Sequence, residues 1–178
     1  LLLRLSKSKL IDKIVVAMPE GKTDDTLSKH VKSLGYSTFR GSEHDVLNRY
    51  FEASKAYGAK NVVRITDDCP LIDPVLVDEV IREFLNKKVD YVSNVDPPTF
   101  PDGMSVEIID RKCLENNYSN DLGKYHLEHV TTYIRENKKF SKSNFENKED
   151  YSHIRLTLDE VIDLEVINSI FKYFQPDI

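Results

Sequence analysis

The strongest constraint on the fold is an alternation of short strand-like runs with longer amphipathic segments. The first run, at residues 14–17, is uniformly apolar, which is typical of a strand that is buried on both faces. Further strands are expected at 36–39, 61–66 and 89–95. Segments with helical spacing of apolar side chains lie between them, at 26–34, 46–57 and 74–84. This order predicts a three-layer α/β fold, with an open, mostly parallel sheet and helices on both faces.

The second half of the chain is less regular than the first. Three prolines between residues 96 and 103 predict a loop, because proline cannot donate to a strand ladder. An alternating pattern predicts a half-buried strand at 104–109, with helices from about residue 112 and at 126–137. A last strand is expected at 152–158, and Asp159 is expected to begin a helix. The inward side chains of that helix would be Val161, Leu164, Ile167, Ile170 and Phe171.

Two helix starts carry capping signals. Asp73 followed by Pro74 has the form of an N-cap residue with proline in the first helical position. Ser42 and Asp45 resemble a capping box in front of the next helical segment. Because a cap is a sufficient reason for an aspartate at this place, we interpret Asp73 as structural and not as part of a site.

Length and composition exclude several classes of function. A chain of 178 residues is expected to form a single domain over residues 1–178. Its 25 Lys and Arg against 30 Asp and Glu give a net charge of −5, which indicates neither nucleic-acid binding nor membrane binding. The apolar run at 14–19 is too short to span a bilayer. Two cysteines without a signal peptide predict a reducing, cytoplasmic location.

Acidic residues gather at the end of the strand expected at 61–66. Asp67 and Asp68 follow it directly, and ligands of open α/β sheets bind outside the carboxyl ends of the strands. Adjacent carboxylates that leave a buried strand need a cation or hydrogen-bond donors to compensate them. Mg²⁺ suits this position, because it takes one or two carboxylates and completes its shell with substrate phosphates. The alternative is that one aspartate caps a turn while the other is solvated.

Asp159 stands at a second junction between a strand and a helix. Taken alone, it would be interpreted as a helix cap. Taken with Asp68, it would place two carboxylates on the same rim of the sheet. Such a pair fits a metal ion held against a triphosphate.

A loop and three arginines are further candidates for substrate binding. Residues 100–107 predict a polar loop over the sheet edge, which would serve as a lid or specificity loop or would be only a turn. Arg40, Arg49 and Arg64 lie nearest to the expected strand ends, where an anionic substrate needs cationic partners. Because Arg64 lies within a strand, the alternative for that residue is a buried ion pair.

Two other reactive groups are not assigned to a metal or nucleophilic site. His126 and His129 have zinc-like spacing, but no further ligands complete a recognisable set. Contacts to a sugar, or a plain surface, are better explanations of these histidines. Cys69 lies beside the acidic pair without a histidine arranged as its base, so it is not predicted to be a nucleophile.

The sequence around Asp68 resembles a known signature. Residues 63–74 read Val-Arg-Ile-Thr-Asp-Asp-Cys-Pro-Leu-Ile-Asp-Pro. This run is similar to the R-I-T-x-D-C-P-L-x-D-P signature of cytidylyltransferases of the spore-coat-polysaccharide type, which are relatives of CMP-sialic acid and CMP-Kdo synthetases. The similarity continues in the same order at residues 39–50, 90–94, 100–103, 128–134 and 155–160. It therefore covers essentially the whole chain.

The resemblance implies a nucleotidyltransferase of the glycosyltransferase-A-like, Rossmann-type α/β fold. Such enzymes transfer CMP from CTP to a sugar with Mg²⁺ and release pyrophosphate, in the synthesis of cell-surface polysaccharides or glycans. By the same resemblance, Asp68 and Asp159 are the metal ligands and catalytic residues. Asp67 departs from the family, where relatives often have a small residue. The residues expected to bind the substrates are Arg40, Arg49, Asp67, Asp102, Glu107 and His129.

One part of the family pattern is not found in these 178 residues. Enzymes of this kind begin with a strand and an Arg- and Gly-containing loop, ending in Pro-Gly-Lys, that surrounds the triphosphate. The chain opens with Leu-Leu-Leu-Arg-Leu, at about the helix that would follow this loop. We expect the strand and the loop to precede residue 1, and we expect catalysis only where the loop is present.

Two other functions stay open at the level of the sequence. A glycosyltransferase that uses a finished nucleotide sugar would employ Asp67 and Asp68 as its acidic metal motif, and it would release no pyrophosphate. A non-catalytic module of the same fold would bind no nucleotide in a Mg²⁺-dependent way. For the enzyme, the expected partners are CTP, a sugar and a second copy of the chain, with residues 97–137 as the contact between copies.

Overall fold

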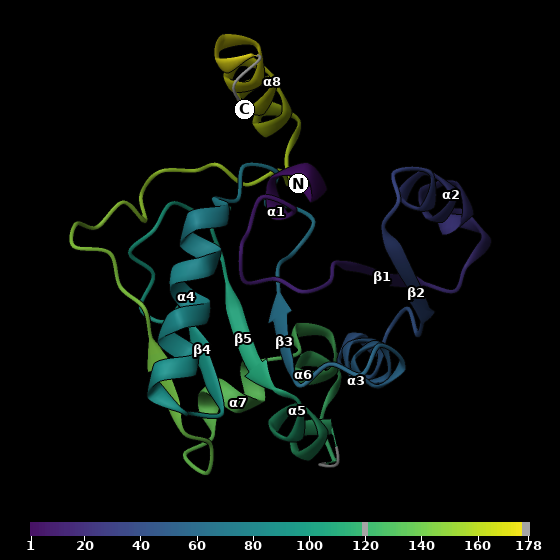
Figure 1. The fold of residues 1–178 in the computed structure, drawn as a ribbon, viewed down its shortest axis with the longest axis vertical. Helices are drawn as coiled ribbons and strands as arrows, with labels where there is room; N and C mark the ends of the chain where they lie inside the picture. The colour runs from purple at the N-terminus through teal and green to yellow at the C-terminus, as the bar shows by residue number, and fades with distance from the viewer. Residues whose placement is uncertain (119–120, 176–178) are drawn as a thin grey trace. The chain divides into compact units, whose positions relative to one another are not determined.

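The structure, a computed structural model, describes residues 1–118 and 121–175 and divides into two compact units (Figure 1). The first unit comprises Leu1–Ile11, Val63–Ile108 and Ser143–Ile178. The second comprises Asp12–Val62 and Ile109–Lys142. Both units combine strands with helices, and the predicted α/β fold class is confirmed.

The second unit begins with a parallel pair of strands, β1 (Val15–Pro19) and β2 (Ser37–Gly41). The 3-10 turn η1 (Lys22–Asp24) and the helix α2 (Asp25–Ser33) connect them. Helix α3 (Val46–Ala56) packs against both strands and buries Leu47 and Phe51. Strand, helix and parallel strand therefore follow one another as the sequence predicts.

Three short helices complete the second unit: α5 (Arg111–Tyr118), α6 (Lys124–His129) and α7 (Thr132–Glu136). The single helix predicted at 126–137 is wrong, because Val130 has a φ of 60° and separates α6 from α7. The carbonyl of Val130 accepts a hydrogen bond from Asn117 Nδ2 at 2.9 Å, and its side chain is fully buried. A tertiary contact thus interrupts a segment whose local pattern favours one helix.

The first unit contains the helices α1 (Leu2–Leu5), α4 (Pro74–Lys87) and α8 (Val161–Phe174) and the strand β4 (Tyr91–Ser93). Strand β4 belongs to a four-stranded sheet of order β3-β5-β4-β6, with β3 (Asn61–Arg64), β5 (Glu107–Asp110) and β6 (Lys142–Asn144). Helix α4 packs against β4. It begins where predicted, because the Asp73 carboxylate accepts a hydrogen bond from the Val75 N–H at 2.8 Å.

The segment before α8 differs from two predictions. Within the described residues, 152–158 form no strand, and their ladder contact is a single bridge between Asp102 and Arg155. Helix α8 begins at Val161 and not at Asp159, because Glu160 is its cap and Asp163 completes a capping box. Asp159 therefore lies outside the helix, where its carboxylate is not used as a cap.

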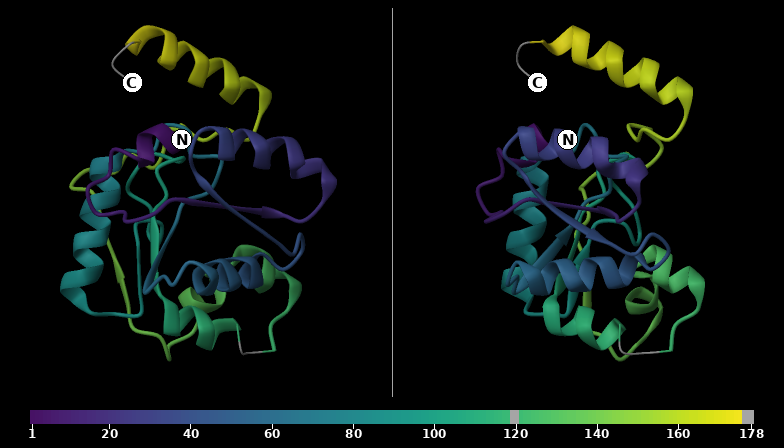
Figure 2. Two further views of the ribbon diagram at one scale, coloured as in Figure 1. Left: turned by 45° about the vertical axis from the view of Figure 1, so that its right-hand side comes forward. Right: turned by 90° about the vertical axis from the view of Figure 1, so that its right-hand side faces the viewer.

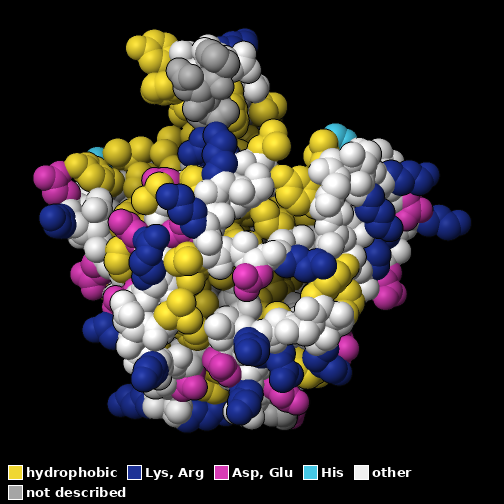
Figure 3. Space-filling model, viewed as in Figure 1, with side chains coloured by type: hydrophobic (Ala, Val, Ile, Leu, Met, Phe, Trp, Pro, Cys, Tyr) yellow, Lys and Arg dark blue, Asp and Glu magenta, His cyan; other side chains and the backbone are white. Residues whose placement is uncertain are grey.

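Helix α8 buries only part of the face that its pattern predicts, because Ile167, Ile170 and Phe171 are buried or half-buried while the two predicted residues before them are exposed. Ile167 is 3% exposed, as expected, but Val161 and Leu164 are 82% and 48% exposed. Asp163 takes an inward position instead, four residues before Ile167. Figure 2 shows α8 standing apart from α4 of the same unit, and Figure 3 shows apolar side chains gathered on α8. Among the helices of the described chain, none has the length and apolar character needed to cross a membrane.

Candidate active site

The first half of the site is the turn that follows β3. Cys69 N donates to Thr66 O at 3.4 Å and closes the turn. The Thr66 hydroxyl donates to Asp68 Oδ1, and the Cys69 thiol lies 3.4 Å from the same oxygen. Oδ2 of Asp68 accepts no hydrogen bond from the residues that the structure describes. Asp68 therefore has one oxygen held by the turn and one available to a ligand.

The second half of the site is residues 157–159, which lie beside this turn. Leu158 N donates to the Asp68 carbonyl at 2.8 Å, and the Thr157 hydroxyl donates to it at 3.1 Å. Oδ2 of Asp159 accepts from Arg155 Nη2 at 3.3 Å, whereas Oδ1 has no hydrogen-bond donor in the described part of the chain. The structure thus places on adjoining segments the two aspartates that the sequence pairs.

Asp68 and Asp159 fit a magnesium site that phosphate oxygens complete. Each carboxylate has an oxygen without a hydrogen bond from the described residues, and Mg²⁺ typically uses one or two carboxylates together with substrate phosphates. Residues 1–118 and 121–175 contain no group of three or more His, Cys, Asp or Glu that could hold a metal. A cation bound by this pair would therefore take its remaining ligands from water and substrate.

An ion pair between Arg155 and Asp163 supports the second half of the site. Arg155 Nε and Nη2 donate to the two oxygens of Asp163 at 2.9 and 2.7 Å. Asp163 is 5% exposed and also accepts from the N–H groups of Asp159 and Glu160, at 3.0 and 2.8 Å. The hydrogen bonds from Arg155 and from these N–H groups hold the pKa of Asp163 well below its usual range. Neither residue is among the candidates predicted from the sequence, although their spacing of four before and four after Asp159 is a signal that could have identified them.

Stability is expected to depend on pH through Asp163. Its pKa is lowered in the folded protein, so it stays charged there, while the unfolded chain takes up a proton near pH 4. The stabilising contribution is complete above about pH 4 and is lost as the pH falls below that value. Urea denaturation from about pH 7 to about pH 3 should therefore cost the wild type more stability than Asp163→Asn. An equal loss in both proteins would contradict this prediction.

Arg155 also connects Asp102 to the site. Asp102 N donates to Ile154 O at 2.9 Å, Leu156 N donates to Asp102 O at 2.8 Å, and Arg155 Nη1 lies 3.2 Å from Asp102 Oδ2. Asp102 lines a hollow of about 340 Å³. The other side chains around this hollow include those of Asn94, Phe100, Met104, Ser105 and Ser152. The mixture of polar and apolar groups suits a small polar ligand.

Glu107 is buried in the first unit and its carboxylate is fully engaged. Arg64 Nη1 donates to one of its oxygens, and the Tyr91 hydroxyl donates to the other at 2.5 Å. Glu107 is 3% exposed. This geometry confirms that Arg64 belongs to a buried ion pair. The role of Glu107 in sugar binding stays a prediction, and its burial gives that role no support.

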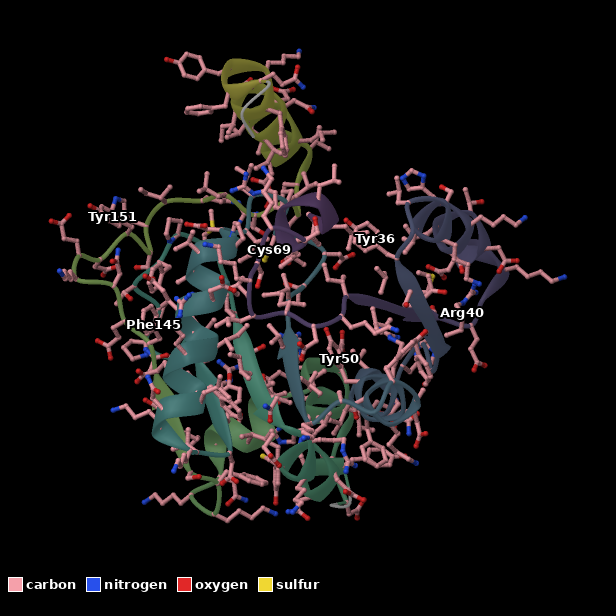
Figure 4. The ribbon with its side chains drawn as sticks, in the orientation of Figure 1. Tyr36, Arg40, Tyr50, Cys69, Phe145 and Tyr151 are labelled. Atoms are coloured by element: carbon pink, nitrogen blue, oxygen red, sulfur yellow. The ribbon has the colours of Figure 1, made fainter. Side chains whose placement is uncertain are left out.

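Arg40 and Arg49 belong to the second unit, where both hold loops in place. Arg40 projects from β2 (Figure 4) and donates to the carbonyl of the last β1 residue at 2.6 Å, to a carbonyl of the following loop at 2.5 Å and to Asp25 at 3.0 Å. Arg49 Nη1 donates to Ser42 O at 2.5 Å. The buried Nε of Arg49 has no hydrogen-bond partner among the described residues. Binding of an anionic substrate by either arginine stays a prediction.

Asp67 and His129 are both exposed. Asp67 leaves the turn next to Asp68 and has no hydrogen-bond partner in the described chain. His129 ends α6 in the second unit, with its ring centroid 4.6 Å from that of Tyr125. Their exposure is compatible with contacts to substrate, and their substrate-binding roles stay predictions.

Cys69 has the properties of a structural cysteine. Its side chain is 2% exposed and lies just beyond β3 (Figure 4). Burial raises the pKa of the Cys69 thiol to about 11. Because the thiolate is the nucleophilic form, a thiol that stays protonated at neutral pH is a poor nucleophile, as the sequence predicts.

A family model and two related proteins match nearly the whole chain. A family model described as Cytidylyltransferase matches residues 1–173. An uncharacterized protein of Methanocaldococcus jannaschii is 39% identical over 177 residues, which are 98% of this chain and 72% of that protein. The spore coat polysaccharide biosynthesis protein SpsF of Bacillus subtilis is 31% identical over 165 residues, which are 90% of this chain and 68% of that protein.

Two solved structures have a similar fold. A cytidylyltransferase from Leptospira borgpetersenii superposes with a TM-score of 0.94 at 37% identity, over 97% of this chain and 74% of that one. CMP:2-keto-3-deoxy-manno-octonic acid synthetase complexed with CTP superposes with a TM-score of 0.71 at 14% identity, over 96% and 85% of the two chains. The second likeness concerns the fold alone, which is that of a nucleotidyltransferase.

Proposed function

Because this chain belongs to the cytidylyltransferase family, we propose that it transfers CMP from CTP to a sugar, with Mg²⁺ held by Asp68 and Asp159. The observation that carries the proposal is the position of these aspartates on adjoining segments, each with one oxygen unbonded by the described residues. The name of the B. subtilis relative supports an acceptor used in polysaccharide synthesis, and the CTP complex of the synthetase supports a CTP donor.

The reaction is a displacement at the α-phosphorus of CTP. A sugar oxygen forms a bond to this phosphorus, the bond to the oxygen between the α- and β-phosphates breaks, and pyrophosphate leaves with the electron pair. The proton of the sugar hydroxyl passes to solvent. Such transfers depend on positioning and charge neutralisation, so conspicuous acid–base residues are not required. When bound, Mg²⁺ supplies that neutralisation at the phosphate oxygens.

This chain contributes the positions of the groups around the phosphates and the sugar. Asp68 and Asp159 would hold the cation, since each carboxylate has an oxygen without a hydrogen bond from the described residues. The sugar binds in the hollow beside Asp102, whose carboxylate accepts hydrogen bonds from its hydroxyls. Asp67 is exposed beside Asp68, and Arg40, Arg49 and His129 of the second unit stay candidates for substrate binding. The assignments of Asp68, Asp159, Arg49, Asp102 and His129 follow the family resemblance. Asp67 departs from the family, and Arg40 is a candidate because it lies near an expected strand end.

A cytoplasmic homodimer completes the proposal. The chain has only two cysteines, both buried, and such sparse use of cysteine supports a reducing compartment. Light scattering coupled to gel filtration measures the mass in solution. A mass twice the 20.6 kDa of the chain is expected, and a monomer at micromolar concentration would contradict the dimer.

Thermal unfolding of protein that includes the expected phosphate-binding loop, with each nucleoside triphosphate and with and without Mg²⁺, tests the proposed function. A ligand at a hundred times its dissociation constant adds about 2.7 kcal/mol to the free energy of unfolding. We expect CTP with Mg²⁺ to raise the melting temperature more than ATP, GTP or UTP does. We expect CTP without Mg²⁺ to have a much smaller effect.

Pyrophosphate release from CTP in the presence of candidate sugars is the second measurement. Release that requires both the sugar and Mg²⁺ would support the transfer. Nucleotide binding without any release would favour a glycosyltransferase that acts on a finished nucleotide sugar. No Mg²⁺-dependent shift with any triphosphate would favour the non-catalytic module.

A further inference from the structure

Arg155 occupies a central position that the proposed reaction does not use. It lies between Ile154 and Leu156, whose backbone groups are hydrogen-bonded to Asp102 at 2.9 and 2.8 Å. It stands four residues before Asp159 in the chain. One guanidinium contacts three aspartates, Asp102, Asp159 and Asp163. The two functional aspartates and their structural support therefore meet at a single side chain.

The orientation of the guanidinium is set by Asp163. Nε and Nη2 donate to the two oxygens of one carboxylate, which is the fork-to-fork geometry that fixes an arginine in a plane. The Asp163 side chain is itself 6% exposed and is held by the N–H groups of Asp159 and Glu160. The Asp163 carboxylate thus fixes the side chain of Arg155 relative to the backbone of Asp159.

The outer contacts of Arg155 reach the site. Nη1 lies 3.2 Å from Asp102 Oδ2 and Nη2 lies 3.3 Å from Asp159 Oδ2. The side chains of Asp102 and Asp159 are 52% and 53% exposed, and ion pairs in such surroundings contribute little to stability. These two contacts are therefore not explained by a gain in stability. The contact with Asp159 occupies its Oδ2, while Oδ1 has no donor from the described residues.

We propose that Arg155 is the positioning residue of the metal site: it holds Oδ2 of Asp159 so that Oδ1 meets the cation, and it ties the Asp102 loop to that carboxylate. This inference rests on the proposed function, because it takes Asp159 to be a metal ligand. Arg155 touches neither the cation nor the reacting atoms. Residues that orient metal ligands by hydrogen bonds typically change metal affinity ten- to a hundredfold when they are replaced.

The charge of Arg155 acts in the opposite direction to its geometry. A guanidinium beside Asp159 repels a cation, so its removal alone would strengthen cation binding. Loss of the hydrogen bond that orients Asp159 would weaken it. Lysine at position 155 keeps the charge but cannot form the planar fork to Asp163 and reach two further carboxylates. Methionine removes both the charge and the donors, so the two variants separate geometry from charge.

Mn²⁺ binding to the 178-residue chain, followed by the loss of the free-ion signal in electron paramagnetic resonance, tests the inference without any turnover. We expect Arg155→Lys and Arg155→Met both to weaken Mn²⁺ binding by about tenfold or more. Arg111→Lys is the matched control, because Arg111 makes an exposed ion pair with Glu115 at 3.7 Å, away from both aspartates in its contacts. Circular dichroism and thermal unfolding of each variant confirm that it is folded, and Arg155→Lys serves if Arg155→Met is not.

Asp159→Asn separates the failure of this inference from that of the proposed function. Mn²⁺ binding that is lost in Asp159→Asn but unchanged in both Arg155 variants would overturn the positioning role and leave the metal site in place. Tighter binding in Arg155→Met with no change in Arg155→Lys would make Arg155 a competing charge and would also overturn it. Binding that persists in Asp159→Asn, or no binding to the wild type, would overturn the proposed metal site and the inference together.

Discussion

Asp68→Asn is expected to abolish CMP transfer while the protein stays folded. Asparagine has the shape of aspartate and keeps an oxygen that accepts the Thr66 hydroxyl, so the turn after β3 is preserved. The variant removes the charge that holds the cation against the phosphates. Because electrostatic stabilisation dominates such transfers, we expect the rate of pyrophosphate release to fall about a thousandfold or more. The melting temperature without ligand should change little.

The rate of pyrophosphate release is compared between Asp68→Asn and its parent protein. The parent protein must itself release pyrophosphate from CTP. Glu79→Gln is the control, because Glu79 is an exposed carboxylate on α4 of the same unit and has no described partner. It should keep the wild-type rate and the Mg²⁺-dependent stabilisation by CTP. Normal turnover by Asp68→Asn would refute the metal role of Asp68.

Gly103→Ala is expected to give the largest loss of stability among single methyl additions to this chain. Gly103 has a φ of 94°, a backbone angle that residues other than glycine rarely adopt. A Cβ at this position would lie 2.5 Å from the carbonyl carbon of Leu156 and 2.6 Å from Thr157 N. Both contacts are with backbone, so no side-chain rotation relieves them. The strain and the overlap together predict a loss of about 3 kcal/mol or more in the free energy of unfolding.

Gly58→Ala distinguishes the overlap from the backbone strain. Gly58 has a φ of 64°, but beyond its chain neighbours no heavy atom of the described residues lies within 4 Å of the place that an alanine methyl group would take. We expect this variant to lose only about 1 kcal/mol. Urea denaturation gives both values. Equal losses in the two variants would mean that the close approach of Gly103 to residues 156–157 has no energetic weight.

The same pair of variants reports on the site. Residues 155–157 carry the Arg155 and Thr157 side chains that contact Asp159. A displacement of Gly103 from this segment should therefore weaken Mg²⁺-dependent CTP binding in Gly103→Ala, measured at a temperature where the variant is folded. Gly58→Ala should bind CTP as the wild type does.

Local patterns in the sequence were sufficient for most of the regular elements. The apolar run at 14–17 predicts β1, and Asp73 with Pro74 predicts the start of α4, because the capping hydrogen bond joins residues two positions apart. The sequence also pairs Asp68 with Asp159, but part of its reason is wrong: residues 152–158 of the described chain form no strand, and hydrogen bonds from Leu158 and Thr157 to the Asp68 carbonyl bring the two segments together.

Contacts between distant residues decided what the patterns could not. Residues 152–158 have the composition of a strand, but their partners are single groups far away in the chain, at Asp102 and at the Asp68 carbonyl. Val130 breaks a helical pattern because its carbonyl is bound by Asn117. The family resemblance assigns Glu107 to the sugar side, yet hydrogen bonds from Arg64 and Tyr91 engage both oxygens of its carboxylate.

The amino-acid sequence by itself therefore determined the order of the elements and the identity of the acidic pair. Tertiary structure decided which oxygens of that pair are left for a ligand. The reason is physical. Helix and strand formation depend on neighbours within a few positions, whereas the shorter hydrogen bond to the Asp159 carboxylate comes from Arg155, whose direction Asp163 sets from the next helix. A local sequence pattern cannot predict the orientation of a side chain that a partner in another element fixes.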